Sequence, residues 1–205
     1  WINGVHLGKR PYGYISFSYE LTDHVVFGKD NVIAVRADNA GQPASRWYTG
    51  AGIYRHVRLV FKDQVYIPQY GVFVTTPKVD EKQATVATSA EVVNRSNVSR
   101  QLSLLTFLFD PSGKPVKINE TKAVEVGANQ KATLRGEITF ERPELWNFGN
   151  GVLYKVQVQI REKKKILDSE TIFTGVRSFE FVPATGFWLN GKNIKLKGAC
   201  LHHDG

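Results

Sequence analysis

Apolar and polar residues alternate along most of this chain, and no long stretch shows the 3.6-residue period of an amphipathic helix. The clearest alternation falls in residues 152–160, where apolar side chains occupy every second position: Val152, Tyr154, Val156, Val158 and Ile160. Turn-forming residues return roughly every eight to twelve positions, a spacing typical of β-sandwiches. The pattern therefore predicts an all-β protein.

The first 62 residues contain the pattern of four or five short strands. Asn3-Gly4 is a strong signal for a two-residue hairpin turn between Trp1-Ile2 and a return through Val5 and Leu7. Further strands are predicted from the alternating segments 15–19, 31–37 and 53–61, and a loop is predicted over residues 38–52. So few strands, without obvious closing partners, predict only part of a sandwich in residues 1–62.

A second set of strands begins after Pro68, which predicts a domain boundary near Lys62-Asp63 and a second domain over residues 63–182. Its seven predicted strands are 72–74, 84–92, 102–109, 116–126, 130–140, 152–160 and 166–175. Segment 102–109 is apolar on both faces, as expected for a central strand. The strand number and length are those of an immunoglobulin-like sandwich, although the chain has one cysteine, Cys200, and so lacks the disulfide of antibody domains.

Residues 185–205 have a different organisation. Gly186–Leu189 is an apolar strand, Asn190-Gly191 predicts a hairpin turn, and a returning strand is expected through Ile194, Leu196, Cys200 and Leu201. Residues 195–201 have the length of a barrel strand, and side chains at the C-terminal end of such a strand line the active site of a (β/α)₈ barrel. His202 and Asp204 would share one side of that strand.

Composition and charge narrow the function classes. The formal charge is +8, but Lys and Arg are scattered, and the one dense basic run, residues 161–165, fits a solvated hairpin turn. Neither a nucleic-acid partner nor a membrane-spanning segment is expected. The chain has no Met and begins at Trp1, which predicts an interior piece of a longer protein. Three Asn-x-Ser/Thr sequons, at Asn94, Asn97 and Asn119, are interpreted as chance occurrences.

Three stretches could carry chemistry. Residues 42–56 combine Arg46, Trp47 and Tyr48 with glycines, which suits sugar recognition, although the two aromatic rings could equally plug the end of the sandwich. In Glu144-Leu145-Trp146-Asn147, the Trp is interpreted as a packing anchor, and Glu141 with Glu144 lacks a partner that would separate their pKa values. Adjacent strand residues point to opposite faces, so residues 202–204 fit a zinc site poorly.

These segments together resemble glycoside hydrolase family 2. The similarity to its sugar-binding jelly roll is carried by WING, GYISFSYELT, NVIAV and SRWYTGAGIYRHVRL. PELWNFGNGVLY resembles the end of its immunoglobulin-like domain, and GVR followed by GFWLNGKNIKLKGACLHHDG resembles the start of its (β/α)₈ barrel. The resemblance implies a partial jelly roll in 1–62, an immunoglobulin-like sandwich in 63–182, and a truncated barrel in 183–205. Within the family, the Arg-Trp-Tyr loop and the Leu-His-His-Asp ending look most like β-galactosidases.

The resemblance implies a retaining glycosidase with two glutamates about 5 Å apart. Both are expected downstream of Gly205, so the chain would hold no catalytic residue and the 205-residue piece would be inactive by itself. The implied substrate-binding residues are His202, which matches a histidine in the glycone subsite, Asp204, Arg46 and Trp47. Some relatives carry an aspartate where this chain has Ser45, which leaves the exact sugar open.

No cofactor is expected in this piece, because the magnesium ligands of the family lie downstream. The implied partner is a β-galactoside or a related carbohydrate, and the parent protein could form a homo-oligomer. The resemblance favours a periplasmic or extracellular setting. Two alternatives stay open: a β-glucuronidase or β-mannosidase on the same scaffold, and a non-catalytic carbohydrate-binding β-sandwich protein.

Overall fold

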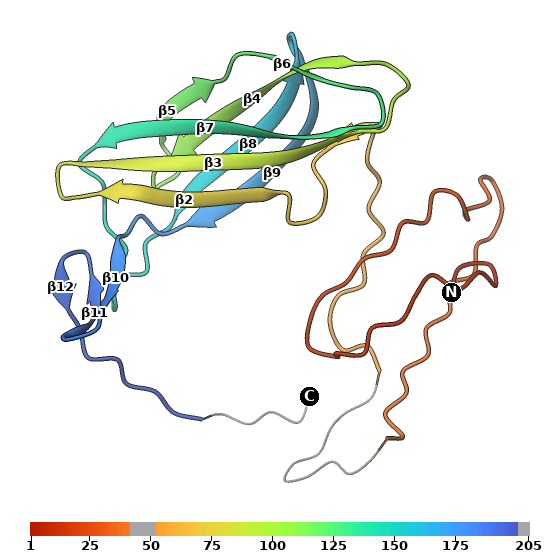
Figure 1. Cartoon of the computed structure of the whole chain (residues 1–205), viewed down its shortest axis with the longest axis horizontal. Coiled ribbons are helices and arrows are strands. Elements are labelled where there is room, and N and C mark those ends of the chain that lie inside the picture. Colours follow the sequence, from red (N-terminus) through yellow and green to blue (C-terminus); the bar gives the residue numbers. More distant parts are fainter. Residues whose placement is uncertain (42–51, 201–205) are drawn as a thin grey trace. The chain divides into compact units, whose positions relative to one another are not determined.

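The computed structural model describes residues 1–41 and 52–200, which divide into two compact units built on Trp1–Leu59 and Val60–Lys197. The described residues contain twelve strands, all in the second unit, and no helix (Figure 1). No helix of this part of the chain could therefore cross a membrane. The prediction of an all-β protein is confirmed.

The strands follow one another with short connections. They are β1 (Val65–Tyr66), β2 (Val72–Val79), β3 (Gln83–Asn94), β4 (Arg100–Phe109), β5 (Pro115–Glu120), β6 (Val124–Val126), β7 (Lys131–Glu141), β8 (Tyr154–Glu162), β9 (Lys165–Thr174), β10 (Phe179–Val182), β11 (Gly186–Leu189) and β12 (Lys192–Asn193). The first nine form two sheets, and the last three form a small separate sheet.

The two larger sheets are antiparallel and form a sandwich. In one sheet, β3 pairs with β7 from Gln83↔Glu141 to Val93↔Lys131, and with β2 and β1. In the other, the order is β5-β4-β8-β9, with β6 also paired to β4 (Figure 1). Strand β4 is central, as its apolar pattern predicted.

Side chains from both sheets meet in one core. The inward positions of β8, Tyr154, Val156, Val158 and Ile160, are all buried, as the period-two pattern predicted. They pack with the buried residues of β3, β4 and β7, which include Val86, Val92, Leu102, Leu104, Leu108, Leu134 and Ile138. Each fully buried aliphatic side chain contributes roughly 1.5–3 kcal/mol to folding, so this core is the main source of stability in the second unit.

A buried asparagine organises one end of the sandwich. The Asn94 side chain is fully buried, and its Nδ2 donates hydrogen bonds to the carbonyl oxygens of Val98, Val126 and Gly127 at 2.9–3.0 Å. Its Oδ1 accepts hydrogen bonds from the amide and the hydroxyl of Ser96. A single side chain thus links backbone groups of the β3–β4 connection to those of β6 and the β6–β7 connection.

An ion cluster fixes the start of the second unit to the sandwich. The Lys62 Nζ lies 2.9 Å from Asp168 Oδ2 and 3.1 Å from Glu170 Oε1, both on β9. Asp168 Oδ2 also accepts a hydrogen bond from the Ile67 amide at 2.9 Å. Burial lowers the pKa of Lys62, but hydrogen bonds and charge attraction from Asp168 and Glu170 outweigh that effect and hold this pKa above its ordinary value.

The first unit differs from its prediction. The Asn3-Gly4 turn forms, with Ile2 and Val5 exchanging backbone hydrogen bonds of 3.0 and 2.8 Å. However, the strands expected at 15–19, 31–37 and 53–61 are not regular strands. A strand needs a neighbour with which to exchange backbone hydrogen bonds, and the described residues of this unit offer only isolated bridges at Ile2–Val5 and Ile2–Ile33.

Two further strand predictions are wrong in their bounds. Segment 116–126 is split into β5 and β6, because the Thr121 hydroxyl accepts the Leu104 amide hydrogen bond and interrupts the ladder. The return after Asn190-Gly191 ends at Asn193, and the described part of the expected strand 195–201 forms no strand. A parallel barrel strand is stabilised by strands on both sides, and the described residues supply none there; the barrel itself stays a prediction. The short strands β1 and β10 were not predicted.

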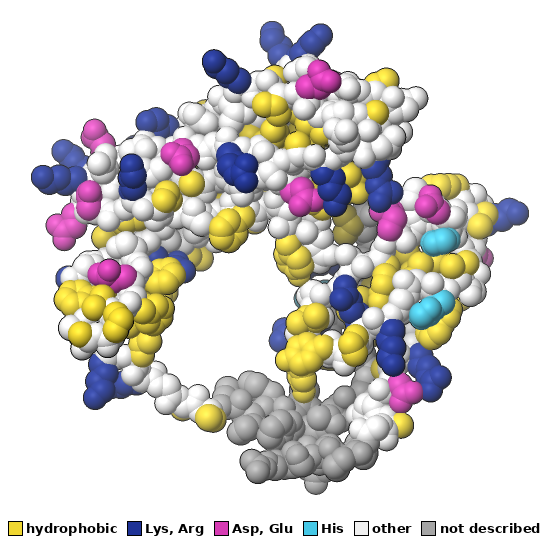
Figure 2. Space-filling view, viewed as in Figure 1, with side chains coloured by type: hydrophobic (Ala, Val, Ile, Leu, Met, Phe, Trp, Pro, Cys, Tyr) yellow, Lys and Arg dark blue, Asp and Glu magenta, His cyan; other side chains and the backbone are white. Residues whose placement is uncertain are grey.

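The distribution of charged side chains on the surface agrees with the prediction that Lys and Arg are scattered. On the face shown in Figure 2, Lys and Arg side chains are dispersed and interspersed with Asp and Glu, without a basic stripe. The basic run 161–165 spans the hairpin between β8 and β9, whose turn is formed by Lys163, at a φ of 55°, and Lys164. The prediction of a solvated turn is confirmed.

Candidate functional site

The predicted sugar contacts fall in the two segments outside the described residues. Arg46 and Trp47 lie in 42–51, and His202 and Asp204 lie in 201–205. The zinc interpretation of 202–204 falls there too. These assignments stay predictions.

The described flanks of the 42–51 segment carry polar and aromatic groups. On one side, the Ala40 amide and the Arg36 guanidinium hold the pKa of Asp38 below its usual value. On the other side, the Arg55 guanidinium lies 5.3 Å from the centroid of the Tyr54 ring, which is 60% exposed. An exposed aromatic ring beside a guanidinium can stack on a sugar and donate to its hydroxyls.

The Glu144–Asn147 stretch is a structural joint, as the packing interpretation of Trp146 predicted. A methyl group added at Gly175 would lie only 2.7 Å from Trp146 Cγ, so the indole lies directly against the backbone there. The Trp146 amide donates to the Val176 carbonyl at 2.9 Å, and the Arg177 guanidinium lies 5.0 Å from the ring centroid. These contacts hold the half-buried indole in place as a packing anchor.

The neighbouring carboxylates are exposed and do not form a catalytic pair with a buried partner. Glu141 and Glu144 both lie at the surface, and the nearest ordered contact is the Glu144 amide, which donates to the Tyr154 hydroxyl at 2.9 Å. Burial raises the pKa of Tyr154, so this phenol stays protonated at neutral pH. The interaction closes the edge of the sandwich core.

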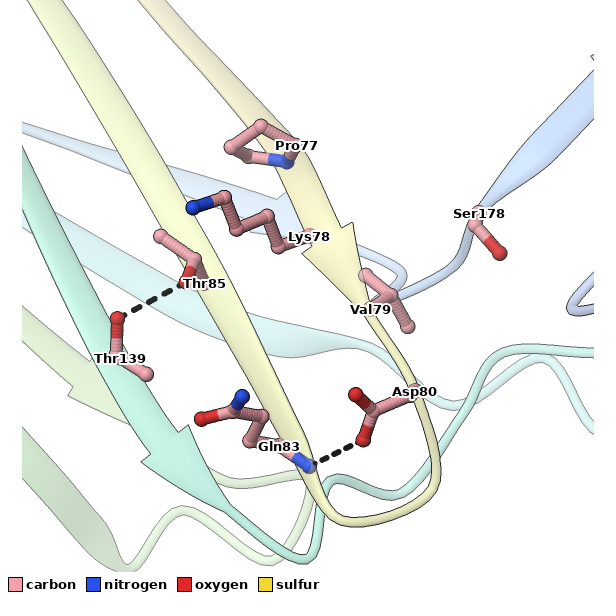
Figure 3. Close-up of a pocket in the computed structure, with 8 residues that line it drawn as sticks. All are labelled: Pro77, Lys78, Val79, Asp80, Gln83, Thr85, Thr139 and Ser178. Atoms are coloured by element: carbon pink, nitrogen blue, oxygen red, sulfur yellow. Dashed lines mark hydrogen bonds between the residues drawn. The ribbon is translucent and has the colours of Figure 1, made fainter.

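One surface hollow of about 550 Å³ opens beside the hairpin between β2 and β3 (Figure 3). Some of its polar groups are already paired: the Asp80 carboxylate accepts hydrogen bonds from the Lys82 and Gln83 amides, and the Thr85 hydroxyl bonds that of Thr139 at 2.9 Å. Across the described ranges, no group of three or more His, Cys, Asp or Glu side chains could hold a metal ion. Lys78 and Asp80 are the charged groups that line this hollow.

Comparison with known proteins identifies the family. The model of the family described as "Glycosyl hydrolases family 2" matches residues 65–177, which contain the sandwich and the joint at Trp146. Over its full length, the chain is 39% identical to the β-galactosidase BoGH2A of Bacteroides ovatus and 38% identical to a putative β-glucuronidase of Formosa agariphila. The chain spans 24% and 19% of the lengths of these two relatives.

Solved structures agree. A crystal structure of a glycosyl hydrolase family 2 member from Bacteroides cellulosilyticus superimposes with a TM-score of 0.92 at 36% identity, over 99% of this chain and 28% of that one. The chain therefore belongs to glycosyl hydrolase family 2. Similarity to relatives with two different names leaves the sugar specificity open.

Two asparagines that hold the second unit together were not recognised as such from the sequence. Asn190 was assigned only a turn, yet its side chain contacts the sandwich at Trp146 and Asn147. Asn94 was interpreted only as a chance sequon. The Asn-Gly dipeptide could signal the turn at residue 190, but no local pattern shows what an asparagine side chain reaches in space.

Proposed function

We propose that this chain is part of a retaining exo-glycosidase that hydrolyses terminal β-galactosides. The observation that carries the proposal is the 39% identity to a β-galactosidase along the whole chain, within a family of glycosyl hydrolases. Retaining hydrolysis needs two carboxyl groups about 5 Å apart, one as nucleophile and one as acid and base. In this proposal, a (β/α)₈ domain that follows the hairpin supplies both, and this chain supplies scaffold and one edge of the sugar pocket.

The proposed sugar contacts have separate tasks. His202 and Asp204 hydrogen bond to hydroxyl groups of the terminal sugar, with bonds that strengthen as the oxocarbenium-like transition state forms. Trp47 stacks on the C–H face of the ring, and Arg46 donates hydrogen bonds at the position where Ser45 replaces the aspartate of some relatives. No cofactor is needed for the role of this chain, and Mg²⁺ in the parent protein would act elsewhere.

A β-glucuronidase is the second candidate, and the 38% identity to a putative β-glucuronidase over 205 residues favours it. The two sugars differ at two positions: a glucuronide carries a carboxylate at C6 where a galactoside carries a hydroxymethyl group, and the C4 hydroxyl is equatorial in a glucuronide but axial in a galactoside. A guanidinium such as that of Arg46 can form a bidentate ion pair with the carboxylate, but with a galactoside it can only donate hydrogen bonds to uncharged hydroxyl groups.

The first test compares substrates on the protein that carries this chain. Hydrolysis of nitrophenyl β-galactoside, β-glucuronide and β-mannoside is measured as kcat/KM. The proposal expects the galactoside to be preferred at least tenfold. Preference for the glucuronide or the mannoside contradicts it. If none is hydrolysed while calorimetry detects galactose binding, a non-catalytic carbohydrate-binding role replaces the enzyme.

A second test uses Arg46→Gln, with Arg46→Lys as the matched control that keeps the charge. If the sugar is galactose, R46Q replaces guanidinium hydrogen bonds to uncharged hydroxyl groups by weaker amide ones, and kcat/KM falls about 2- to 10-fold. If it is a glucuronide, loss of a charged pair lowers kcat/KM about 10- to 150-fold, and R46K recovers part of it. If R46Q has the same kcat/KM as the wild type on the best substrate, Arg46 is not part of the sugar site.

A further inference from the structure

The small sheet of β10, β11 and β12, which we call the hairpin, turns between β11 and β12 at Asn190-Gly191. The Asn190 side chain makes contacts beyond this turn. Asn190 and Gly191 have φ angles of 49° and 74°, the left-handed pair that a two-residue hairpin requires. Asparagine and glycine both tolerate this conformation. The turn itself therefore needs only the backbone of Asn190.

Within the hairpin, Asn190 pairs with the residue that precedes β10. Its amide donates to the Ser178 carbonyl at 2.9 Å, and its Oδ1 accepts from the Ser178 amide at 3.0 Å. The carboxamide oxygen thus takes the place of a backbone carbonyl and extends the β10–β11 ladder by one pair.

The other half of the carboxamide leaves the hairpin. Asn190 Nδ2 donates to the Trp146 carbonyl and to Asn147 Oδ1, both at 2.9 Å. Trp146 and Asn147 belong to the connection between β7 and β8, so both bonds tie the hairpin to the sandwich. The Asn190 side chain thus uses both of its donor hydrogens and one of its two acceptor lone pairs. Three simultaneous hydrogen bonds hold the carboxamide in one orientation.

The connection from the sandwich to the hairpin is held at a second point. The Thr76 hydroxyl on β2 donates to the Arg177 carbonyl at 2.7 Å, while the Trp146 ring packs on Gly175. Residues 175–178 are therefore fixed from β2 on one side and from the β7–β8 connection on the other. A connection that is free to hinge would not need these contacts.

We propose that Asn190 is a positioning residue: through Trp146 and Asn147 it joins the hairpin and the sandwich into one rigid body. The chain beyond Asn193 then leaves in a direction that the sandwich dictates. We name the group formed by Asn190, Trp146, Asn147 and Ser178 the Asn190 junction. This inference goes beyond the proposed glycosidase function and holds for any domain that follows.

Asn190→Asp is the sharpest variant for a test. It has the same shape, tolerates a positive φ, and keeps an oxygen that can accept the Ser178 amide. Its second oxygen would face the Trp146 carbonyl and Asn147 Oδ1, so two attractive contacts become repulsive. The matched control is Asn193→Ala, because Asn193 Nδ2 donates only to the Thr185 and Phe187 carbonyls inside the hairpin, at 2.7 and 3.3 Å.

The measurement is the alignment of amide vectors by residual dipolar couplings on the full chain, together with amide hydrogen exchange. In the wild type and N193A, β10–β12 should share one alignment tensor with the sandwich. In N190D the hairpin should lose that common alignment, while continued protection of the Ser178 amide, whose acceptor oxygen is kept, shows that the hairpin itself is still folded.

Retention of the common alignment in N190D would overturn the proposal, and so would its loss in N193A to the same degree. If N190D unfolds the hairpin, Asn190→Gly replaces it, because glycine keeps the left-handed turn and removes the side chain. A folded but independently oriented hairpin in N190G supports the proposal. Unfolding of the hairpin in both variants shows that Asn190 serves the turn alone.

Discussion

Gly175→Ala is a direct test of how tightly Trp146 is held. Gly175 is not in the left-handed region, so alanine adds no backbone strain there. The added Cβ would, however, lie 2.7 Å from Trp146 Cγ and 2.8 Å from both Cβ and Cδ1. These atoms lie at the base of the side chain, so the whole indole must move, and its stacking with Arg177 and the bond to Val176 move with it.

The expected cost follows from two opposing effects. Overpacking of this kind costs typically about 1–3 kcal/mol, while replacing glycine by alanine stabilises by roughly 0.4–1 kcal/mol through the unfolded chain. The net loss in free energy of unfolding should be about 1–2 kcal/mol. For a chain of this length, that lowers the Tm by roughly 2–8 °C.

The matched control is Gly151→Ala, where the new Cβ would lie 3.6 Å from Trp146 Nε1, an ordinary contact. G151A should be as stable as the wild type or slightly more stable. Urea and thermal unfolding followed by circular dichroism give both values, and tryptophan fluorescence reports the displaced indole. The reasoning is refuted if G175A has the same Tm and the same free energy of unfolding as G151A and its tryptophan fluorescence is unchanged. Trp146 would then not be fixed against the backbone.

Two further predictions concern the second unit. Lys62→Met should destabilise it by about 1–2 kcal/mol near neutral pH, since charged hydrogen bonds are lost. Because the folded pKa of Lys62 is raised, its contribution is complete below the ordinary value of 10.5 and disappears as the pH rises through the folded pKa. Urea unfolding of both proteins between pH 7 and 11.5 should show the difference shrinking, and a constant difference refutes the linkage. Asn94→Ala should cost about 2–3 kcal/mol, because three hydrogen bonds donated by a fully buried side chain are lost. Asn97→Ala, at an exposed neighbour, should stay within about 0.5 kcal/mol of the wild type in the same unfolding assay, and equal losses would show that the Asn94 bonds contribute little.

The sequence predicted the structure best where the signal lies in a few neighbouring residues. Period-two apolar residues placed β8 and its inward face, and Asn190-Gly191 placed a turn, because both signals depend on neighbouring residues alone. Pairing depends on partners far along the chain. For that reason Thr121, which interrupts a run that alternates well, split a predicted strand, and segments 15–19 and 31–37 alternate without forming strands.

The candidate site was less accessible to the same reasoning. Arg46, Trp47, His202 and Asp204 came from a family resemblance, and the family is confirmed, but these positions lie outside the described residues. The packing role of Trp146 was predictable from a bulky ring beside glycines. The second role of Asn190 was not, because its partners at 146 and 147 are more than forty positions away in sequence.

The burial of Asn94 has a consequence for the choice of production host. Asn94-Arg95-Ser96 is an N-glycosylation sequon, and secretory pathways of eukaryotic cells attach glycans while the chain is still entering the lumen. The attachment atom is Nδ2 of a fully buried side chain, the same atom that donates to the carbonyl oxygens of Val98, Val126 and Gly127. A glycan there would keep the sandwich from closing, and Ser96→Ala would remove the sequon only by deleting a hydroxyl that bonds Asn94. Yeast or mammalian secretion should therefore yield misfolded, glycosylated material, whereas a bacterial host avoids the conflict.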